Sequence, residues 1–312
     1  MKDSNKVSKK FSASDIPMPF VKWAGGKRRI APLLIETFPS DFNPSKHRFF
    51  EPFIGGGALM FALGNSEGTI YIPGEKLFIN DTNPELTNTY EVIRDSVSSL
   101  IKALEKLSKK VDEKTYYEIR TVIPREKVAR AARFIFLNKT CFNGLWRVNS
   151  KGEFNVPFGN PKNPSLFNES NLRACSQRLQ GSKITNLSFD KAVAKARKGD
   201  LVYFDPPYIP LSASASFSAY SKEGFGIQEQ ELLCKTILNL SAKGVYVLLS
   251  NSDTPMTRKI FRKALTLRKV LMSRSISSSG PTRKPVFEVL GMNYSHLRGS
   301  AMGDLDLISR PN

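Results

Sequence analysis

The chain has 312 residues, enough for one large domain or two, and its hydrophobic content of 40% suits an ordinary globular core. Its 47 lysines and arginines outnumber its 28 aspartates and glutamates, which gives a formal net charge of +19. A charge of this size favours a polyanionic partner, because cationic side chains release counterions from phosphates. A generally basic protein without such a partner is the alternative.

Metal ligands and long apolar segments are scarce. Three cysteines form no CxxC pair and only two histidines are present, so we expect no disulfide scaffold and no metal site. No apolar stretch approaches the ~20 residues that cross a bilayer, and the N-terminus has no signal-peptide pattern. We therefore expect a cytoplasmic, nucleoid-associated protein without membrane contact or an obligatory protein partner.

The hydrophobic pattern predicts strands alternating with helices. Residues 1–15, rich in Lys and Ser, are expected to form a basic flexible arm. Apolar, β-branched or aromatic runs predict strands over residues 48–53, 77–81, 201–205, 244–250, 266–273 and 286–294. Helical patterns lie at residues 27–38, 84–108, 125–141 and 228–241. This alternation predicts an α/β fold with a mostly parallel sheet covered on both faces.

Residues 96–188 interrupt this alternation and are interpreted as an inserted, mainly helical domain. Within it, residues 143–156 have the pattern of a β-hairpin with a turn near Ser150-Lys151-Gly152. Residues 16–95 and 189–294 then form the α/β domain, and residues 295–312 form a polar tail.

A carboxylate, a rigid turn and an aromatic ring follow one predicted strand, as Asp205-Pro206-Pro207-Tyr208 after the apolar run at residues 201–204. The prolines remove backbone donors, so the carbonyls of Asp205 and Pro206 are free to accept hydrogen bonds. The carboxylate is a further acceptor, and Tyr208 offers a stacking face. These groups match a flat base that carries an exocyclic amino group. A strand-ending turn with a capping Asp is the structural alternative.

A glycine-rich segment, residues 51–61, follows another predicted strand and opens a helix. Glycines at such a turn let the backbone approach a nucleoside closely. A nicotinamide fingerprint starting at Gly55 would require glycine at position 60, where Met60 stands. The alternative ligand for such a turn is the adenosyl group of S-adenosylmethionine, which has no phosphates, and Glu51 at the strand end is in a place to meet its cationic amino acid part.

Asp81 follows the predicted strand at residues 77–80 and has two interpretations of equal weight. An acidic residue at this place in a nucleotide-binding sheet pairs with ribose hydroxyls. The residues around it are also cap types that precede a helix beginning near Pro84.

A third segment, residues 20–27, contains Gly25-Gly26-Lys27 without the spacing of a phosphate loop. Together, the segments resemble the Dam-type DNA N6-adenine methyltransferases, in which the cofactor motif precedes a target-recognition insert and the catalytic motif follows it. The resemblance spans roughly residues 18–294. Residues 22–27, 51–57, 143–147, 152–159, 205–208, 209–213 and 274–278 carry it.

The resemblance implies a Rossmann-like S-adenosylmethionine-dependent methyltransferase sheet and a site with three sets of residues. The catalytic set is Asp205, Pro206 and Tyr208. The cofactor-binding set is Trp23, Lys27, Glu51, Phe53, Gly55, Asp81 and Asp205. No metal is expected to take part.

The third set is implied to contact double-stranded DNA. Lys22 matches a residue that reaches the first base pair of the recognition site, and Phe142 matches an aromatic wedge beside the target. Asn143 matches a neighbour of the orphaned thymine, and Arg147 matches a reader of guanine, a role with a physical basis in bidentate pairing. The family usually methylates GATC, but Phe142 stands where tyrosine is common and Trp146 where a smaller residue is common. Core packing for Phe142 and Trp146, and a surface ion pair for Arg147, are the structural alternatives.

We therefore predict methyl transfer from S-adenosylmethionine to N6 of an adenine flipped out of duplex DNA, because a stacked base cannot present its amino group to a sulfonium methyl. A catalytically silent DNA-binding regulator is one alternative. A methyltransferase of the same fold acting on cytosine N4, RNA adenine or a glutamine side chain is the other.

Overall fold

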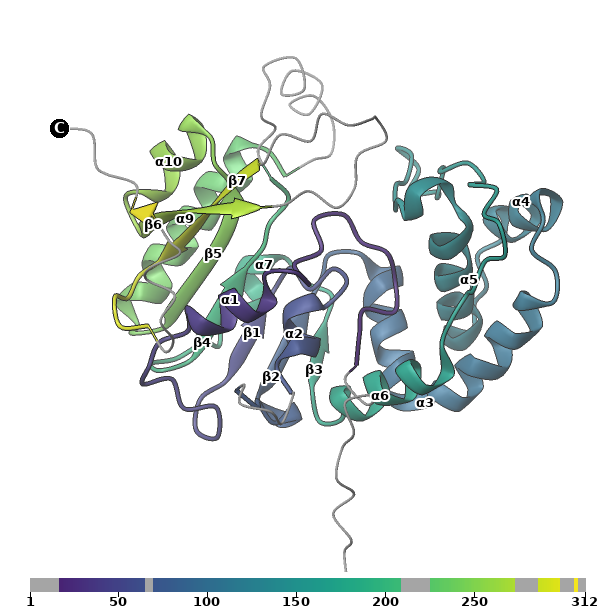
Figure 1. Ribbon diagram of the computed structural model, residues 1–312, viewed down its shortest axis with the longest axis horizontal. Helices are drawn as coiled ribbons and strands as arrows, with labels where there is room; N and C mark the ends of the chain where they lie inside the picture. The colour runs from purple at the N-terminus through teal and green to yellow at the C-terminus, as the bar shows by residue number, and fades with distance from the viewer. Residues whose placement is uncertain (1–16, 65–69, 209–224, 273–285, 298–305, 308–312) are drawn as a thin grey trace, which may run out of the picture. The chain divides into compact units, whose positions relative to one another are not determined.

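The computed structural model describes residues 17–64, 70–208, 225–272, 286–297 and 306–307. The chain divides into two compact units (Figure 1). Unit 1 comprises Met1–Arg28, Gly56–Tyr71 and Asn88–Gln180, and unit 2 comprises Arg29–Gly55, Ile72–Thr87 and Gly181–Asn312. The expected basic arm, and the family-like segments at residues 209–213 and 274–278, lie outside the described residues.

Unit 2 is built on one sheet with the strand order β3-β2-β1-β4-β5-β7-β6-β8. The strands are β1 (Phe49–Glu51), β2 (Leu77–Asn80), β3 (Lys183–Thr185), β4 (Leu201–Phe204), β5 (Tyr246–Ser252), β6 (Thr266–Met272), β7 (Val286–Met292) and β8 (Asp306–Leu307). The first five strands of this order pair in parallel, and β7, β6 and β8 join antiparallel. The predicted Rossmann-like α/β fold is confirmed.

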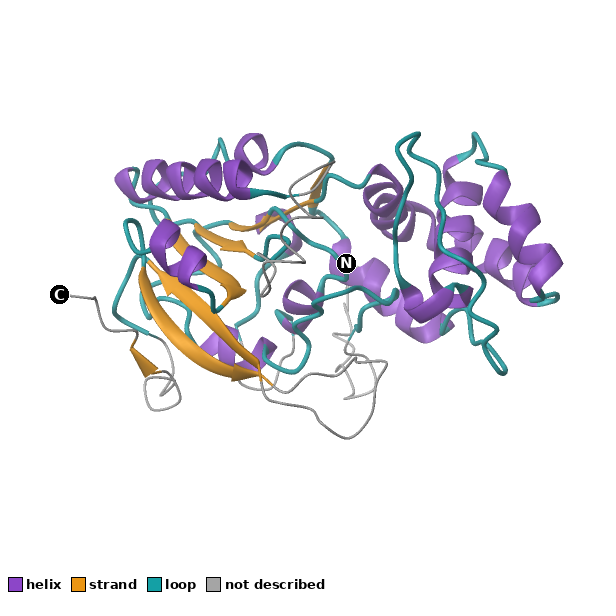
Figure 2. Ribbon diagram, turned by 90° about the horizontal axis from the view of Figure 1, so that it is seen from above, coloured by secondary structure: helices purple, strands orange, loops and turns teal. Residues whose placement is uncertain are grey.

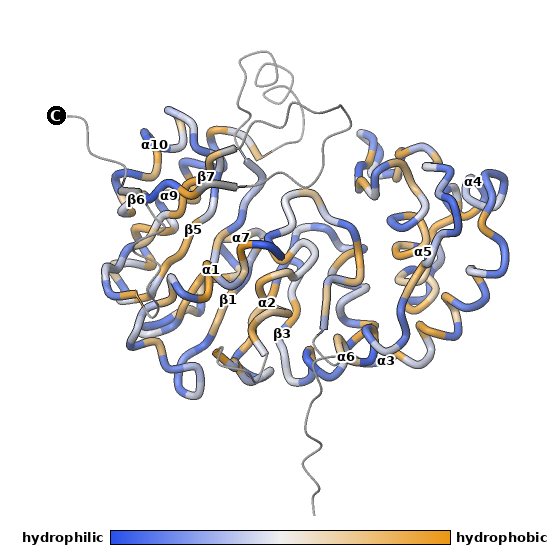
Figure 3. Tube along the Cα trace, viewed as in Figure 1, coloured by the Kyte–Doolittle hydropathy of each residue, from blue (hydrophilic) through white to orange (hydrophobic). Residues whose placement is uncertain are grey.

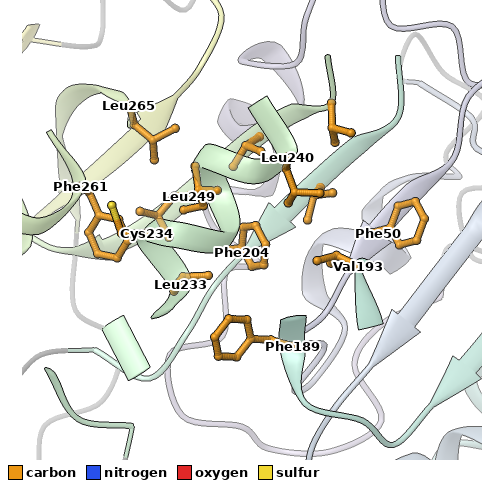
Figure 4. Packing of buried hydrophobic residues seen from close by; sticks show 14 of the residues in the cluster. Phe50, Phe189, Val193, Phe204, Leu233, Cys234, Leu240, Leu249, Phe261 and Leu265 are labelled. Atoms are coloured by element: carbon orange, nitrogen blue, oxygen red, sulfur yellow. The ribbon is translucent and has the colours of Figure 1, made fainter. Parts of the chain in front are cut away.

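Helices cover both faces of this sheet because its strands are apolar on both sides (Figure 2). On one face, α7 (Phe189–Ala192), α9 (Ile227–Ala242) and α10 (Pro255–Phe261) enclose the cluster that includes Phe204, Leu233 and Leu249 (Figure 4). On the other face, Phe38 after α1 (Ala31–Glu36) stacks on Phe49 of β1 at 5.8 Å. The strand β5 is hydrophobic at its centre, at Val247, Leu248 and Leu249, and is buried after its first residue (Figure 3).

Unit 1 is mainly helical. Its helices are α2 (Ala58–Ala62), α4 (Glu113–Thr121), α5 (Lys127–Thr140) and α6 (Glu169–Leu179), and α3 (Pro84–Ser108) contributes all but its first turn. Side chains cap three of these helices: Asp112 accepts from the Thr115 N–H, Glu126 from Val128 and Ala129, and Asn168 from Asn171. A local core forms around Tyr116, whose hydroxyl donates to the Val156 carbonyl at 2.8 Å.

The predicted hairpin of unit 1 is present in a short form. One antiparallel bridge joins Val148 and Phe154, and the Asn149 N–H donates to the Glu153 carbonyl at 2.9 Å. The turn between them needs a left-handed residue, which Gly152 provides with φ of 77°. The hairpin follows η3 (Phe142–Gly144), a short 3-10 turn at the end of α5.

The predicted strands and helices are confirmed with boundaries shifted by a few residues, and several elements went unpredicted. The helix expected at residues 27–38 begins only at Ala31, because residues 28–30 form a turn after the Gly25-Gly26 pair. Strand β3 was missed because Lys183–Thr185 is short and exposed at its first residue. The remaining unpredicted elements are η2 (Gly74–Lys76), η3, α4, α6, α7, α10 and β8.

Candidate active site

Three predicted carboxylates lie at one edge of the sheet in unit 2. Glu51 is the last residue of β1, Asp81 follows β2, and Asp205 follows β4. The strands are parallel, with Phe50 of β1 opposite Phe78 of β2 and Val202 of β4, so their carboxyl ends meet at the same edge. Because β1 is central and the chain winds away from it in both directions, this edge is where ligands bind in open α/β sheets.

Asp81 ties the glycine-rich turn to this edge. Its Oδ2 accepts from the Gly55 N–H at 3.1 Å and its Oδ1 accepts from the Asn83 N–H at 2.9 Å. The helix cap belongs to Asn83, whose Oδ1 accepts from Glu85 and Leu86 in the first turn of α3. Burial raises the pKa of the Asp81 carboxyl above its ordinary value, although the backbone N–H groups act against this shift.

An apolar wall stands beside these carboxylates. The ring of Phe53 lies 5.5 Å from that of Phe189 and 5.4 Å from that of Phe225, centroid to centroid. Phe53 is partly exposed, whereas Glu51 is only 3% exposed. This part of the edge therefore combines an aromatic surface with a buried acidic group, a combination that suits a nucleoside carrying positive charge.

Asp205 is held by a neighbouring strand. The Ser250 hydroxyl on β5 donates to Asp205 Oδ1 at 2.9 Å, and the Tyr203 hydroxyl lies 2.8 Å from Ser250 Oγ. Because the single hydroxyl hydrogen of Ser250 goes to Asp205, Tyr203 donates to Ser250. Burial and the nearby Asp205 charge raise the pKa of Tyr203, so its phenol stays protonated as a donor.

The carbonyl groups of the turn after Asp205 have different partners. The Pro207 carbonyl accepts from Gln230 Nε2 at 3.0 Å. Within the described residues, no hydrogen-bond donor reaches the Pro206 carbonyl. The Tyr208 hydroxyl donates to Glu288 Oε2 at 2.9 Å, which anchors the ring to β7, and burial raises the pKa of this phenol.

Trp23 and Lys27, both predicted to bind the cofactor, lie in unit 1. Trp23 is partly buried, and a Cβ added at Gly56 would lie 3.3 Å from the Cβ of Trp23, so only glycine fits comfortably there. Lys27 is buried, with 4% of its surface exposed, and its Nζ donates to the Gly25 carbonyl at 3.0 Å.

Lys22 and the segment that carries the other predicted DNA contacts are joined by one buried amide. Asn138 of α5 accepts from the Lys22 N–H at 2.8 Å and donates to the Lys22 carbonyl at 2.8 Å. The same amide donates to the Gly144 carbonyl at 3.1 Å. Gly144 has a positive φ of 64°, and a Cβ there would lie 2.5 Å from the Lys22 side chain. Lys22 and the 142–147 segment therefore form one rigid surface of unit 1.

The aromatic residues of this segment have different environments. Phe142 is 49% exposed, so the core-packing alternative does not describe it. Asn143 beside it is exposed in the left-handed conformation, with φ of 55°. Trp146 is a packing residue, because its ring lies 4.3 Å from Phe134 and 4.5 Å from Phe154.

Arg147 is exposed at the base of the hairpin. Its Nε donates to Asn155 Oδ1 at 2.8 Å, and its Nη2 lies 3.5 Å from the Asn155 carbonyl. A guanidinium has five N–H donors, so this contact orients the group and leaves donors for another acceptor. The alternative of an ion pair does not apply to this contact, because the partner is a neutral amide.

The thiols of the chain are buried and protonated. Burial raises the pKa of Cys141 to about 11 and that of Cys175 to about 12. Within the described residues, no group of three or more His, Cys, Asp and Glu side chains is arranged to hold a metal ion, and no helix has the length and apolar character to cross a bilayer.

Several residues were missed at the level of sequence: Ser250, Asn251, Gln230 and Glu288 around the turn in unit 2, and Asn138 beside Lys22 in unit 1. One signal was available, since Ser250-Asn251-Ser252 ends an apolar strand, as Asp205 does. Polar residues at the end of a buried parallel strand face the ligand edge of the sheet. Gln230, Glu288 and Asn138 lie inside regular elements and carry no comparable local signal.

The chain is similar to known proteins over most of its length. Residues 23–274 match the family described as D12 class N6 adenine-specific DNA methyltransferase. The chain is 37% identical over 286 residues to the Type II methyltransferase M1.LlaDCHI of Lactococcus lactis subsp. cremoris, covering 89% of this chain and 96% of that protein. It is 38% identical over 291 residues to the Type II methyltransferase M.MjaIII of Methanocaldococcus jannaschii, covering 88% and 99%. It is 35% identical over 279 residues to a DNA adenine methylase of Escherichia coli K12, covering 88% and 94%.

Proposed function

This chain belongs to the D12 class of N6 adenine-specific DNA methyltransferases, and we propose that it methylates N6 of an adenine flipped out of duplex DNA, within the sequence GATC. The observation that carries the proposal is the Asp205-Pro206-Pro207-Tyr208 turn at the carboxyl edge of the parallel sheet, beside β1 and its glycine-rich turn. This edge holds acceptors for an amino group and acidic residues for a cationic nucleoside.

The chemistry of the acidic residues fits S-adenosylmethionine better than a dinucleotide. Glu51 and Asp81, at the ends of adjacent parallel strands, would repel a pyrophosphate but attract the ammonium group and accept from ribose hydroxyls. Phe53 provides an apolar surface for a flat ring. When bound, S-adenosylmethionine supplies an electrophilic methyl group on a sulfonium. Trp23 and Lys27 of unit 1 are proposed as further contacts of this ligand on the basis of the family resemblance alone.

The target amino group has two N–H donors, and the turn offers two acceptors. We assign one to the Asp205 carboxylate and the other to the Pro206 carbonyl. Accepting these hydrogens draws electron density onto N6 and directs its lone pair toward the methyl group. The N–C bond would form as the S–C bond breaks, which leaves a neutral thioether, and N6 would lose one proton to solvent. The rate then comes from alignment and preorganised charge, without a covalent enzyme intermediate.

Tyr208 is proposed to stack on the extruded adenine. The hydrogen bond from its hydroxyl to Glu288 restricts rotation of the ring, so the stacking face is preset. Extrusion costs a few kcal/mol of unstacking and unpairing, which stacking on an aromatic side chain offsets in part.

DNA recognition is assigned to the surface of unit 1 that Asn138 organises. Lys22 is proposed to contact the first base pair, Phe142 to wedge into the duplex, Asn143 to contact the orphaned thymine, and Arg147 to read a guanine. The exposure of Phe142 and the oriented guanidinium of Arg147 support these roles. The net charge of +19 supports a polyanionic substrate.

The test uses purified full-length protein, labelled S-adenosylmethionine and an unmethylated duplex with one GATC. Digestion to nucleosides and mass spectrometry separate N6-methyladenine from N4-methylcytosine. We expect N6-methyladenine at GATC, and an inactive Asp205→Ala variant that still folds. Methylation in duplexes that lack GATC would refute the proposed specificity, and an active Asp205→Ala variant would refute the proposed chemistry. Cofactor binding without turnover of the wild type would favour a DNA-binding regulator.

A further inference from the structure

A buried chain of hydrogen bonds ends on the proposed catalytic turn. The Ser252 N–H donates to Asn251 Oδ1 at 2.8 Å, Asn251 Nδ2 donates to Gln230 Oε1 at 3.2 Å, and Gln230 Nε2 donates to the Pro207 carbonyl at 3.0 Å. Asn251 and Gln230 are completely buried, and Ser252 is 4% exposed. The chain therefore connects β5, α9 and the turn after β4 without help from surface groups.

The direction of this chain is determined at both ends. A proline carbonyl only accepts hydrogen bonds, so Gln230 presents its NH₂ group to Pro207 and its oxygen to Asn251. A backbone N–H only donates, so Asn251 presents its oxygen to Ser252 and its NH₂ group to Gln230. Both amide orientations follow from these partners, and neither amide can rotate by half a turn without losing two bonds.

The turn after β4 depends on a side-chain partner because its two prolines donate no backbone hydrogen bonds. Pro206 and Pro207 lack N–H groups, so neither can form the backbone hydrogen bond that closes an ordinary turn. The Pro207 ring fixes φ, so a single free backbone torsion, ψ of Pro207, separates the Pro207 carbonyl from the peptide plane that carries the Pro206 oxygen. A hydrogen bond that holds the Pro207 carbonyl therefore limits how far this plane can turn, and with it the direction of the acceptor that we assign to the substrate amino group.

We propose that Gln230 is a positioning residue for methyl transfer, acting through the Pro207 carbonyl. This inference rests on the proposed role of Asp205 and Pro206 as acceptors for the adenine amino group. Transfer depends on alignment of a lone pair with a methyl group, and an error of about 1 Å in such geometry costs about 100-fold in rate. A residue that only supported the fold would instead affect stability and every binding constant together.

The experiment compares two variants of Gln230 with one control. Gln230→Glu keeps the size of the side chain, but its ionised form cannot donate to Pro207, whereas its protonated form can. Gln230→Met removes the donor without adding charge. Gln228→Glu introduces the same charge two residues away, at an exposed position of the same helix.

For each protein, kcat, KM for S-adenosylmethionine and thermal stability are measured between pH 6 and 9. Burial raises the pKa of a carboxyl at position 230, so the Glu variant regains its donor as the pH falls. Titratable groups on the surrounding elements are common to all variants, so activity is expressed relative to wild type at each pH. These groups are Asp205, Tyr208, Glu229, Cys234, Asp253 and Glu288.

We expect Gln230→Glu to lose about 100-fold in kcat at high pH and to recover toward low pH, with KM little changed. Gln230→Met should show a similar loss at every pH, and Gln228→Glu should follow wild type. Wild-type kcat in Gln230→Met, or equal profiles for the two Glu variants, would overturn the inference. If Gln230→Glu does not fold, the kcat of Gln230→Met alone tests the inference. An inactive Asp205→Ala beside a fully active Gln230→Met would refute the positioning role while leaving the proposed chemistry intact.

Discussion

The hydroxyl of Ser250 donates a hydrogen bond of 2.9 Å to Oδ1 of Asp205. The carboxylate proposed to hold the substrate amino group is therefore oriented from β5, the strand next to its own. Tyr203 donates in turn to Ser250, and both residues are buried, with 1% and 0% of their surface exposed. The three groups form a directed chain whose last acceptor is the proposed catalytic carboxylate.

The Ser250→Ala variant should lose both stability and activity. It leaves the Tyr203 hydroxyl buried without an acceptor, which costs about 1–3 kcal/mol in the free energy of unfolding. It also releases Asp205, for which we expect about tenfold lower kcat, equivalent to ~1.4 kcal/mol. Urea unfolding and single-turnover kinetics measure the two effects. Tyr203→Phe added to Ser250→Ala should restore part of the stability but none of the activity. Strict additivity of the two substitutions would contradict this account.

The ring of Tyr208 should contribute more to methyl transfer than its hydroxyl does. Tyr208→Phe keeps the stacking face and loses the bond to Glu288, so we expect kcat to fall by less than about tenfold. Tyr208→Ala removes the ring and should cost about 1–3 kcal/mol in binding of the extruded base. Fluorescence of 2-aminopurine at the target position reports extrusion. Equal losses of kcat and of base extrusion in the two variants would show that the hydroxyl, and not the ring, carries the contribution of Tyr208.

Binding of S-adenosylmethionine should weaken in mild acid because of Asp81. Burial raises the pKa of this carboxyl above its ordinary value of 3.8, so protonation occurs at a higher pH than for a typical aspartate. Ribose hydroxyls donate to the ionised form, so affinity is full above the raised pKa and falls as the pH drops through it. Titration calorimetry in buffers of different ionisation enthalpy should detect proton release on binding in that range. Asp81→Asn should bind more weakly and lack this proton release; an unchanged pH profile in Asp81→Asn would exclude Asp81 as the ribose partner.

Arg147→Ala should relax specificity at one base pair. Loss of a bidentate contact to guanine costs about 1–3 kcal/mol at that position and little elsewhere. Competitive methylation of duplexes with single substitutions in GATC provides the measurement. Arg125, an exposed arginine before α5, offers a control, because Arg125→Ala should weaken binding uniformly or leave it unchanged. A uniform loss for Arg147→Ala would identify it as a phosphate contact.

The sequence by itself determined six of the eight described strands, most of the long helices and the acidic residues at the sheet edge. Asp81 and Asp205 each follow an apolar run of strand length, and the carboxyl ends of parallel strands meet at one edge, so their common location was predictable. The turn chemistry of Gly152 likewise predicted the hairpin, because few other residues adopt φ of 77°.

The tertiary structure alone decided which side chains form hydrogen bonds to the predicted site residues. Gln230 lies 23 residues from Pro207 and Asn138 lies 116 residues from Lys22, so no local period links either pair. It also decided the strand order, in which β7 lies between β5 and β6. The spacing of apolar residues along a helix or strand predicts which of its faces is buried, because that face is set by the element's own side chains. Hydrogen-bond partners and strand neighbours depend on segments distant in sequence, which only the packed chain brings together.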